Sequence, residues 1–452
     1  MERFDLAIVG AGASGVLAAV HLHEAAPGLS TAILDAGARA ARGLAYGTPY
    51  GAHLLNVPAG RMSARLGDPG HFERWLEARG IPEAAGVFAP RAHYGDYLAE
   101  LLSEACAPPS RYRRLGGTAV GLTRSGAEWA VHLQDGRALA AGQVVLALGN
   151  LAPADPLGLG ADAPEGYLQD PWAPGAAQGL APDAPVLLLG TGLTMVDLAL
   201  ALRAEGHRGP LHAISRRGLL PRSHEAHAPW PLPVPPVGLS PRAALHWLRG
   251  QARATAEAGG DWRTAVDGLR PHTARIWASW SPEARRSFLR HARPFWEVHR
   301  HRTAPEVARA VARLVEAGDL RVRAGRILAL SPSAAGLSVA WRPRGADREA
   351  RLEVVRVINC TGPASDYQAV DQPLIAQLRR AGWLCPDPLR LGVETGPSGE
   401  VLDRDGRPVP GLFTLGPLRR PALWESTAIP EIRAQAASLA THLAAGSSGS
   451  VP

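Results

Sequence analysis

The 452-residue sequence contains no lysine, and all 48 of its basic residues are arginine. A mechanism that needs a lysine nucleophile or a Schiff base is therefore excluded. Cysteine is also scarce: only Cys106, Cys360 and Cys385 occur, and they form no Cys-x-x-Cys pair. This number and spacing argue against a zinc site or a redox dithiol and favour a reducing, cytoplasmic environment.

Long apolar runs are missing too. No stretch approaches 18 uninterrupted apolar residues, so no membrane span is expected. The chain opens with Met-Glu-Arg and the strand-like FDLAIVG, without the basic region and cleavage site of a secretion signal. The formal charge is +7, but the arginines are spread along the chain with no basic tail, which does not favour nucleic-acid binding. The length suits two or three domains.

A glycine-rich turn follows the first expected strand. Residues 4–9 are an apolar run, GAGASG follows at positions 10–15, and apolar residues then recur at helical spacing. This order is typical of a dinucleotide-binding loop, in which Gly10, Gly12 and Gly15 bring the backbone close to a pyrophosphate at a helix N-terminus. The next expected strand ends at Asp35, 20 residues after Gly15, where a carboxylate can bind the hydroxyls of an adenosine ribose.

A second turn of this kind, GTGLTM at positions 190–195, contains Gly190 and Gly192. Met195 replaces the third glycine, which predicts a wider gap between helix and strand than at Gly15. The acid after the following strand is replaced by Ser215, Arg216 and Arg217. A guanidinium binds a 2′-phosphate that a carboxylate would repel. We therefore expect FAD at the first loop and NADPH at the second, with a solvated Ser-Arg-Arg turn as the alternative there.

The last third of the chain carries features expected of a flavin domain. Residues 354–359 run into a turn at 360–363, and residues 144–149 have the same pattern before the second loop. GLFTLG at 411–416 reads as a strand that ends in glycine, and Pro430 begins a helix whose N-terminus suits an electron-rich flavin edge. The further predicted cofactor contacts are Ser14, Met62, Gly149, Leu193, Thr194, Thr361, Gly362, Gly416 and Ile429.

These patterns predict an α/β fold with two Rossmann-like dinucleotide-binding domains and a helical insertion. The FAD domain is expected to be discontinuous, over residues 1–170 and 356–452. The NAD(P)H domain is expected over residues 183–355, with inserted helices at about 240–317.

Two further regions are candidates for the substrate site. We predict catalytic roles for Asn56, Arg61 and Ser63, because they lie in an irregular stretch and loops on rigid scaffolds carry function. An anion-binding role is predicted for the basic residues of segment 288–305, which are Arg290, Arg293, His299 and Arg300. A charged helix face packed by its tryptophan is the alternative for that segment. No metal site is expected, because the spacing matches no ligand pattern and the cationic surroundings repel a metal ion.

The sequence resembles bacterial FAD/NAD(P)-binding flavoproteins typified by FAD-dependent urate hydroxylase and the L-aspartate N-monooxygenase that forms nitrosuccinate. The resemblance rests on GAGASG with Asp35, RGLAYGTPYGAHLLNVPAGRMSA, DPGHFERWL, PRAHYGDYL, LLLGTGLTMVD, SRRGLLPRSH and RPFWEVHRHRTAP. DP-x-x-F-x-x-W-L and PR-x-x-Y-x-x-YL are also similar to blocks in ornithine and lysine N-hydroxylases. The matching segments cover nearly the whole chain.

The resemblance implies a monooxygenase in which NADPH or NADH reduces FAD, and a flavin C4a-hydroperoxide formed with O₂ oxidises a small electron-rich substrate. Chain length favours urate, which would give 5-hydroxyisourate. The alternatives are N-hydroxylation of an amino acid or amine, a non-oxygenating flavin reductase or dehydrogenase, and a non-enzymatic flavin-binding scaffold. A small substrate is the expected partner, and monomer and homo-oligomer both stay open.

Overall fold

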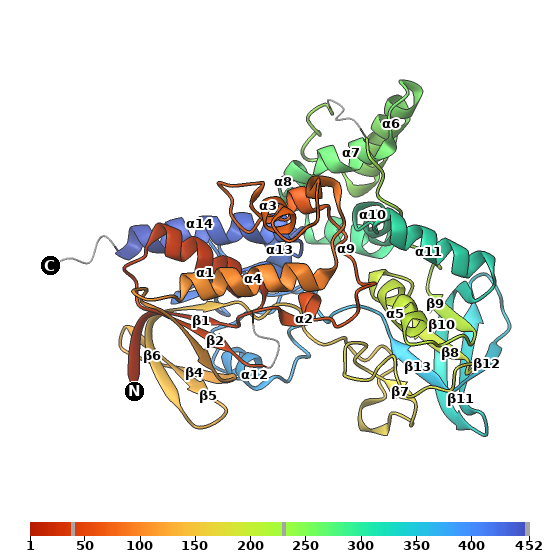
Figure 1. Cartoon of the computed structure of the whole chain (residues 1–452), viewed down its shortest axis with the longest axis horizontal. Helices are drawn as coiled ribbons and strands as arrows, with labels where there is room; N and C mark the ends of the chain where they lie inside the picture. The colour runs from red at the N-terminus through yellow and green to blue at the C-terminus, as the bar shows by residue number, and fades with distance from the viewer. Residues whose placement is uncertain (38–40, 228–231, 448–452) are drawn as a thin grey trace.

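The computed structural model describes residues 1–37, 41–227 and 232–447, and two β-sheets dominate it (Figure 1). The first sheet has the order β14-β15-β6-β1-β2-β3, and its β5 pairs with both β6 and β4. Its strands are β1 (Glu2–Val9), β2 (Thr31–Asp35), β3 (Tyr112–Gly116), β4 (Ala119–Ser125), β5 (Glu128–Leu133), β6 (Ala138–Leu146), β14 (Glu400–Leu402) and β15 (Pro408–Thr414). The first sheet is therefore built from both ends of the chain.

Strand β1 lies at the centre of this sheet and is parallel to β2 and β6. Its Leu6 and Ile8 belong to one apolar core, while Phe4, Ala7 and Val9 belong to the core on the other face. Burial on both faces explains why residues 6–9 form an unbroken apolar run, as buried parallel strands do.

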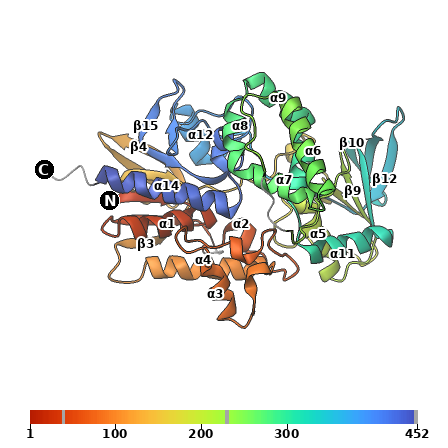
Figure 2. The same cartoon turned by 90° about the horizontal axis from the view of Figure 1, so that it is seen from above.

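Helices from both ends of the chain cover the sheet. Figure 2 shows α14 lying beside α1, and the two helices pack in the same core as α4. The helices of this domain are α1 (Ala13–Ala25), α2 (Gly43–Tyr46), α3 (His71–Glu77), α4 (Arg91–Ala105), α12 (Pro373–Arg380), α13 (Arg420–Leu423) and α14 (Ile429–Ser447). The second core, on the opposite face, includes α12.

The second sheet has the order β12-β11-β10-β9-β8-β13-β7. Its strands are β7 (Tyr167–Leu168), β8 (Val186–Leu189), β9 (Leu211–Ser215), β10 (Leu320–Ser333), β11 (Gly336–Pro343), β12 (Ala350–Val354) and β13 (Arg356–Asn359). The helices α5 (Leu193–Ala204) and α11 (Pro305–Glu316) share one core on this sheet. Strands β7 and β13 lie in this sheet, whereas the sequence analysis places both in the FAD domain. Their short apolar runs do not reveal which sheet they join.

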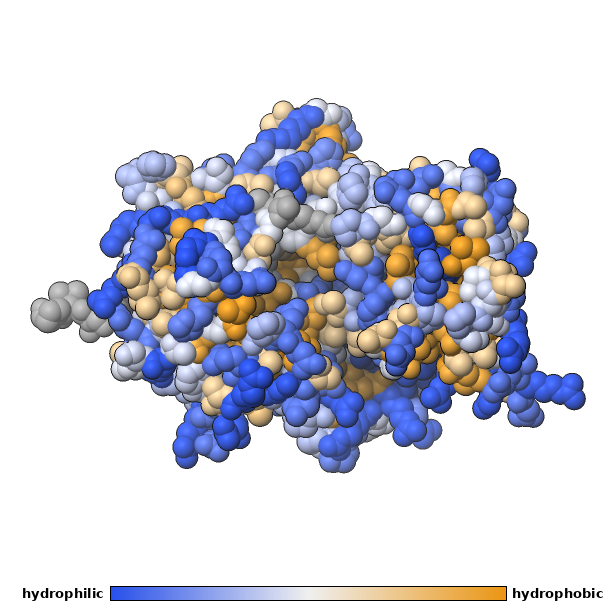
Figure 3. Space-filling view, turned by 90° about the horizontal axis from the view of Figure 1, so that it is seen from below, coloured by the Kyte–Doolittle hydropathy of each residue, from blue (hydrophilic) through white to orange (hydrophobic). Residues whose placement is uncertain are grey.

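The helical insertion is formed by α6 (Pro241–Glu257), α7 (Trp262–Leu269), α8 (Thr273–Ala278), α9 (Pro282–His291) and α10 (Arg293–Arg300). It projects from the two sheets at the top of Figure 1. Seen from below, the opposite surface is hollowed near its centre, with apolar residues around the hollow (Figure 3). None of the described helices combines the length and apolar character needed to cross a membrane. The predicted α/β fold class, with two dinucleotide-binding units and a helical insertion, is confirmed.

Candidate functional site

The first glycine turn has no room for side chains at two of its three glycines. Gly10 has a φ of +107°, and a Cβ there would lie 2.5 Å from the Ala147 carbonyl oxygen. A Cβ on Gly15 would lie 1.8 Å from the Gly10 oxygen. Gly12 caps α1 without a side-chain hydrogen bond, so the first-turn N–H groups are free to bind an anion. This cradle fits the pyrophosphate of a dinucleotide.

Asp35 ends β2 beside this turn, as predicted. One of its carboxylate oxygens accepts a hydrogen bond from Arg114 Nε at 3.0 Å, and the side chain is 11% exposed. The other oxygen accepts the Gly37 N–H at 3.3 Å. The carboxylate is thus held in place by its own neighbours, and its contact with a ribose stays a prediction.

The second turn repeats this construction with one change. Gly190 has a φ of +111°, and its Cβ would lie 2.6 Å from the Cys360 oxygen. Met195 occupies the position that Gly15 has in the first turn, and its side chain is completely buried in the core. Since even a methyl group at Gly15 would overlap the backbone, α5 must stand further from its strand than α1 does. This geometry supports the predicted wider gap.

The two segments that the sequence analysis compares, at residues 144–149 and 354–363, make equivalent backbone contacts. The Ala147 N–H donates to the Val9 oxygen at 2.9 Å, and the Cys360 N–H donates to the Leu189 oxygen at 2.8 Å. Strand β6 therefore lies beside β1, which leads into the first glycine turn, and β13 lies beside β8, which leads into the second. Two residues further on, Gly149 and Gly362 have φ values of +66° and +88°, where a glycine is favoured. Gly149 and Gly362 thus lie in turns that follow the strands beside the two glycine loops.

Gly416, which follows the end of β15, lies against the first glycine turn. A Cβ on Gly416 would lie 2.7 Å from Ser14 Oγ, and the Gly416 N–H donates to Gln435 Oε1 at 2.8 Å. Gln435 Nε2 and Ser426 Oγ are buried, and neither has a partner among the described residues. Such atoms normally find one. These donors fit the polar edge of a flavin, so Gly416, Ser426 and Gln435 would help to hold FAD here.

The irregular loop of the sequence analysis brings Asn56 and Arg61 to a histidine that the sequence analysis missed. His224 Nε2 donates to the Asn56 carbonyl oxygen at 2.9 Å. The pKa of His224 is lowered to about 4, chiefly by burial and then by the charge of Arg302, against the opposing effects of the Asn56 hydrogen bond and Asp267. His224 is therefore neutral at pH 7 and can act there as a hydrogen-bond group, not as a cation.

Ser63 and Met62 have mainly structural contacts. Ser63 Oγ is fully buried and donates to the Asp68 carbonyl at 2.6 Å, while the Ser63 carbonyl accepts from Arg433 at 2.8 Å. Met62 is 2% exposed and packs in the core beside α1. Their predicted roles in catalysis and cofactor binding stay predictions.

The four basic residues of segment 288–305 do not gather into one anion site. Arg290 is exposed on α9, and Arg293 pairs with Glu297 at 2.7 Å. His299 Nδ1 donates to the Phe295 carbonyl at 2.7 Å. Arg300 is 6% exposed and lies 3.4 Å from Glu425 and 3.1 Å from Glu431. Residues on different faces of a helix diverge, so closeness in sequence did not become closeness in space.

The two acids around Arg300 belong to what we call the α14 junction, comprising Gly416, Glu425, Ser426, Glu431 and Gln435. Trp424 precedes it with a φ of +61°, which is strained for a bulky residue and common near functional sites. Burial raises the pKa of Glu425, but Arg300, His301, the Trp296 hydrogen bond and Arg420 together outweigh it, and the net pKa is lowered. Glu431 Oε2 is buried and unpartnered within the described chain. The junction thus joins the turn predicted to hold FAD to Glu425, which is 7% exposed, and to Glu431, which is 20% exposed.

Nothing in the local sequence around Glu425 and Glu431 marks them as special. Their partner Arg300 is more than 120 positions away, and Gln435 contacts Gly416 only because β15 returns to β6. His224 lies at the end of the motif SRRGLLPRSH. That motif was the signal in the sequence that could have identified His224 as a site residue. No cluster of metal-binding side chains occurs in the described parts of the chain.

At the second turn, Thr191 and Ser215 are joined through their hydroxyl groups at 2.8 Å, and the Ser215 hydroxyl also accepts the Gly218 N–H at 3.0 Å. The Arg217 guanidinium lies 4.9 Å from the centre of the Phe295 ring. Arg216 is exposed and has no partner within the described residues. Of the two predicted arginines, Arg216 is therefore the one without a partner within the described residues, and its contact with a 2′-phosphate stays a prediction.

Replacing Arg216 by alanine should raise the KM for NADPH about tenfold or more and leave the KM for NADH nearly unchanged, because an arginine–phosphate contact is charge-assisted. Steady-state oxidation of the two nucleotides measures both constants. Arg208→Ala, another exposed arginine of this domain, is the control. An equal effect of Arg216→Ala on both nucleotides would contradict the assignment.

Comparisons with known proteins agree with this geometry. Residues 7–151 match the model of a family described as FAD-NAD(P)-binding. No curated protein sequence matches significantly. Among solved structures, an ornithine hydroxylase from Pseudomonas aeruginosa is 15% identical with a TM-score of 0.69, covering 98% of this chain and 99% of its own. An L-lysine 6-monooxygenase from Pseudomonas syringae is 18% identical, with a TM-score of 0.66 and coverages of 97% and 99%.

A third structure, an ornithine N-hydroxylase from Kutzneria sp. 744 described with reduced FAD, NADP⁺ and L-ornithine, is 15% identical with a TM-score of 0.62. It covers 98% of this chain and 100% of its own. Residues 7–151 thus carry the pattern of a FAD-NAD(P)-binding family, in agreement with the predicted cofactors. The whole chain has the fold of these ornithine hydroxylase and lysine monooxygenase structures.

Proposed function

We propose that the protein is an FAD-dependent monooxygenase that uses NAD(P)H and O₂ to hydroxylate the nitrogen of a small amine. The observation that carries this proposal is the α14 junction. It places the carboxylates of Glu425 and Glu431 next to the cradle that would hold the flavin. The similar structures named above are hydroxylases of ornithine and lysine, both amines, which supports the same choice.

Bound FAD would supply the redox chemistry, taking hydride from the nicotinamide and activating O₂. The chain supplies the binding. Gly10, Gly12 and Gly15 would hold the pyrophosphate of FAD, and Gly190 and Arg216 would hold NADPH. A cofactor carries the reaction while the protein positions and shields it. Because the cofactor would carry out the redox steps, the protein needs no nucleophilic side chain of its own.

The carboxylates at the junction have a chemical use for an amine. An ammonium group has no lone pair on nitrogen, so it must lose a proton before the nitrogen can be oxidised. Two oxygen atoms would be suited to hold that proton: Glu431 Oε2, buried and unpartnered within the described residues, and the ionised Glu425 carboxylate. Both acids are already paired with arginines, Glu425 with Arg300 at 3.4 Å and Glu431 with Arg300 at 3.1 Å and Arg270 at 2.5 Å. The choice of an amine over an anion such as urate is therefore supported by the similar hydroxylase structures and not by the net charge of the junction.

Urate, which the sequence analysis favours on chain length, is therefore the second candidate. The test is isotopic. The FAD-loaded protein is mixed with NADPH and ¹⁸O₂, and separately with L-ornithine, L-lysine, L-aspartate or urate, and products are analysed by mass spectrometry. We expect an amine to accelerate NADPH oxidation and to receive one labelled oxygen on nitrogen.

Other outcomes contradict the proposal in distinct ways. Label in a urate product and none on amines identifies the urate hydroxylase. Oxidation of NADPH without label in any substrate identifies a reductase or dehydrogenase. FAD that NADPH does not bleach under anaerobic conditions identifies a non-enzymatic scaffold.

A further inference from the structure

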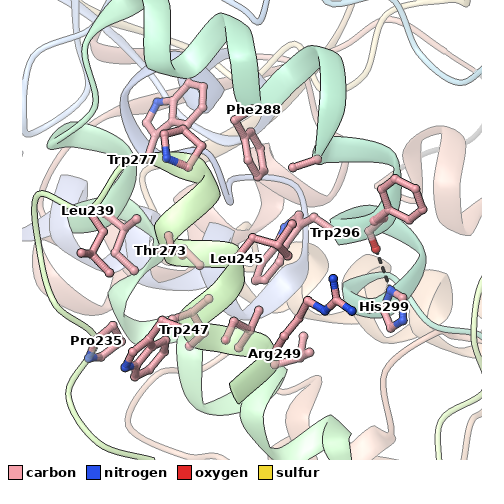
Figure 4. Close-up of a pocket in the computed structure, with 18 of the residues that line it drawn as sticks. Pro235, Leu239, Leu245, Trp247, Arg249, Thr273, Trp277, Phe288, Trp296 and His299 are labelled. Carbon is pink, nitrogen blue, oxygen red and sulfur yellow. Dashed lines mark hydrogen bonds between the residues drawn. The ribbon is translucent and has the colours of Figure 1, made fainter. Parts of the chain in front are cut away.

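Helices α6 to α10 enclose a cavity of about 540 Å³ that none of the functions above uses. Figure 4 shows its aromatic side chains pointing inward from several helices. The lining is almost entirely apolar, and six of the described lining residues are tryptophans: Trp247, Trp262, Trp277, Trp280, Trp296 and Trp424. A cavity of this size and lining is typical of a site for a small organic molecule.

The polar groups of three of these tryptophans are already satisfied by the protein. Trp277 Nε1 donates to the Pro421 oxygen at 2.7 Å, and Trp280 Nε1 donates to the Leu239 oxygen at 2.8 Å. Trp296 Nε1 donates to Glu425 Oε1 at 3.0 Å. These indoles need no hydrogen bond from a ligand, so they offer flat apolar walls to it.

Arginines stack on the rings that form these walls. Arg263 lies 4.7 Å from the ring centre of Trp262, Arg285 lies 4.9 Å from that of Trp277, and Arg420 lies 4.6 Å from that of Trp424. Arg302 and Arg217 stack on Trp262 and Phe295 in the same way. Such cation–π contacts hold the rings in place. Arg263, Arg302 and Arg420 are themselves neutralised by ion pairs with carboxylates that do not line the cavity.

Two ionisable residues belong to the lining of the cavity. Arg249 from α6 and His299 from α10 both line the cavity, and Figure 4 shows the Arg249 guanidinium directed toward His299. Among the described lining residues there is no carboxylate. Arg249 is exposed and has no partner in the described parts of the chain. The mouth of the cavity therefore offers a free positive charge beside the aromatic walls.

We propose that this cavity binds a small amphipathic anion, with its aromatic or alkyl body between the tryptophans and its acidic group beside Arg249 and His299. The site is separate from both dinucleotide loops, since it shares no lining residue with them, and it assumes nothing about the flavin reaction. It is joined to the α14 junction through Trp424 and through the hydrogen bond from Trp296 to Glu425.

The test uses the FAD-loaded protein and two fluorescent probes with nearly the same body. 8-Anilinonaphthalene-1-sulfonate carries an anionic group, and N-phenyl-1-naphthylamine does not. We expect one sulfonate probe to bind per chain, as a rise in its emission and a quench of tryptophan fluorescence. Arg249→Ala should weaken the sulfonate probe about fivefold and the neutral probe less than about twofold, the scale of a partly exposed ion pair.

Two further variants test the location. Ala252→Trp places an indole in the cavity and should abolish binding of both probes. Trp247→Ala removes one wall and should weaken both probes about fivefold, the scale of an aromatic contact. Arg253→Ala alters an exposed residue of the same helix that does not line the cavity, and should change neither probe.

The proposal is overturned if both probes bind Ala252→Trp and Trp247→Ala as they bind the parent protein, because the probes then lie elsewhere. It is also overturned if Arg249→Ala affects the two probes equally, because no anion is then recognised. Thermal unfolding of each variant is measured alongside, since probe binding to a partly unfolded chain would raise emission without the one-to-one ratio.

Discussion

Replacing Gly15 by alanine should cause loss of FAD from the purified protein and lower its free energy of unfolding by about 3 kcal/mol, the upper range for overpacking a well-packed site. The added Cβ would lie 1.8 Å from the Gly10 carbonyl oxygen. The obstacle is backbone, which cannot rotate away as a flexible side chain can. Helix α1 would have to move outward, and its N-terminus would leave the cofactor pyrophosphate.

The ratio of flavin to protein absorbance measures FAD content, and urea unfolding measures stability. Gly28→Ala is the matched control, because Gly28 follows the same helix and a Cβ there would have no atom within 4 Å. It should keep its FAD and unfold at nearly the parent urea concentration. A Gly15→Ala protein with full FAD content would show that this turn does not hold the flavin.

Replacing Arg300 by leucine should lower the free energy of unfolding by about 3–5 kcal/mol at pH 7, the usual effect of removing one partner from a buried ion pair. Arg300 and Glu425 are 6% and 7% exposed, so water cannot replace the lost partner. Arg290→Leu, at an exposed arginine of the preceding helix, is the control and should change stability by less than about 0.5 kcal/mol. Equal unfolding curves for the two variants would contradict this prediction.

The same pair predicts how this difference depends on pH. The folded state lowers the pKa of Glu425 below its ordinary value of 4.5, despite the opposing effect of burial. A group with a lowered folded-state pKa contributes stability above its unfolded pKa and loses that stability as pH falls through the folded pKa. The stability gap between the parent protein and Arg300→Leu should therefore be full above about pH 5, and it should shrink as pH falls below 4.5 and through the lower folded-state pKa. Unfolding measured from pH 3 to pH 8 tests this.

Local patterns were sufficient for the cofactor loops. Gly10, Gly15 and Gly190 have to be glycine because of contacts and backbone angles within a few residues of a strand end, and such constraints leave a readable spacing. The fold class follows from the same signals, since a strand, glycine turn and helix occur twice and each calls for a parallel sheet.

The site beyond these loops depended on contacts between distant parts of the chain. In the sequence, Arg300 is one of several basic residues in segment 288–305. In the structure it pairs with Glu425, which precedes α14, and with Glu431, which lies on α14. The tryptophans of the insertion are likewise visible in the sequence as packing residues. Only the crossing of five helices leaves a space between them instead of a closed core.

The sequence by itself determined where two glycine turns with the pattern of dinucleotide-binding loops lie, because that requirement is local and restricts residue type. The tertiary structure alone decided which charges are neutralised, which acids lie beside the first glycine turn, and that the tryptophans enclose a cavity. Ion pairing and cavity shape depend on distances between elements, and spacing along the chain does not encode those distances.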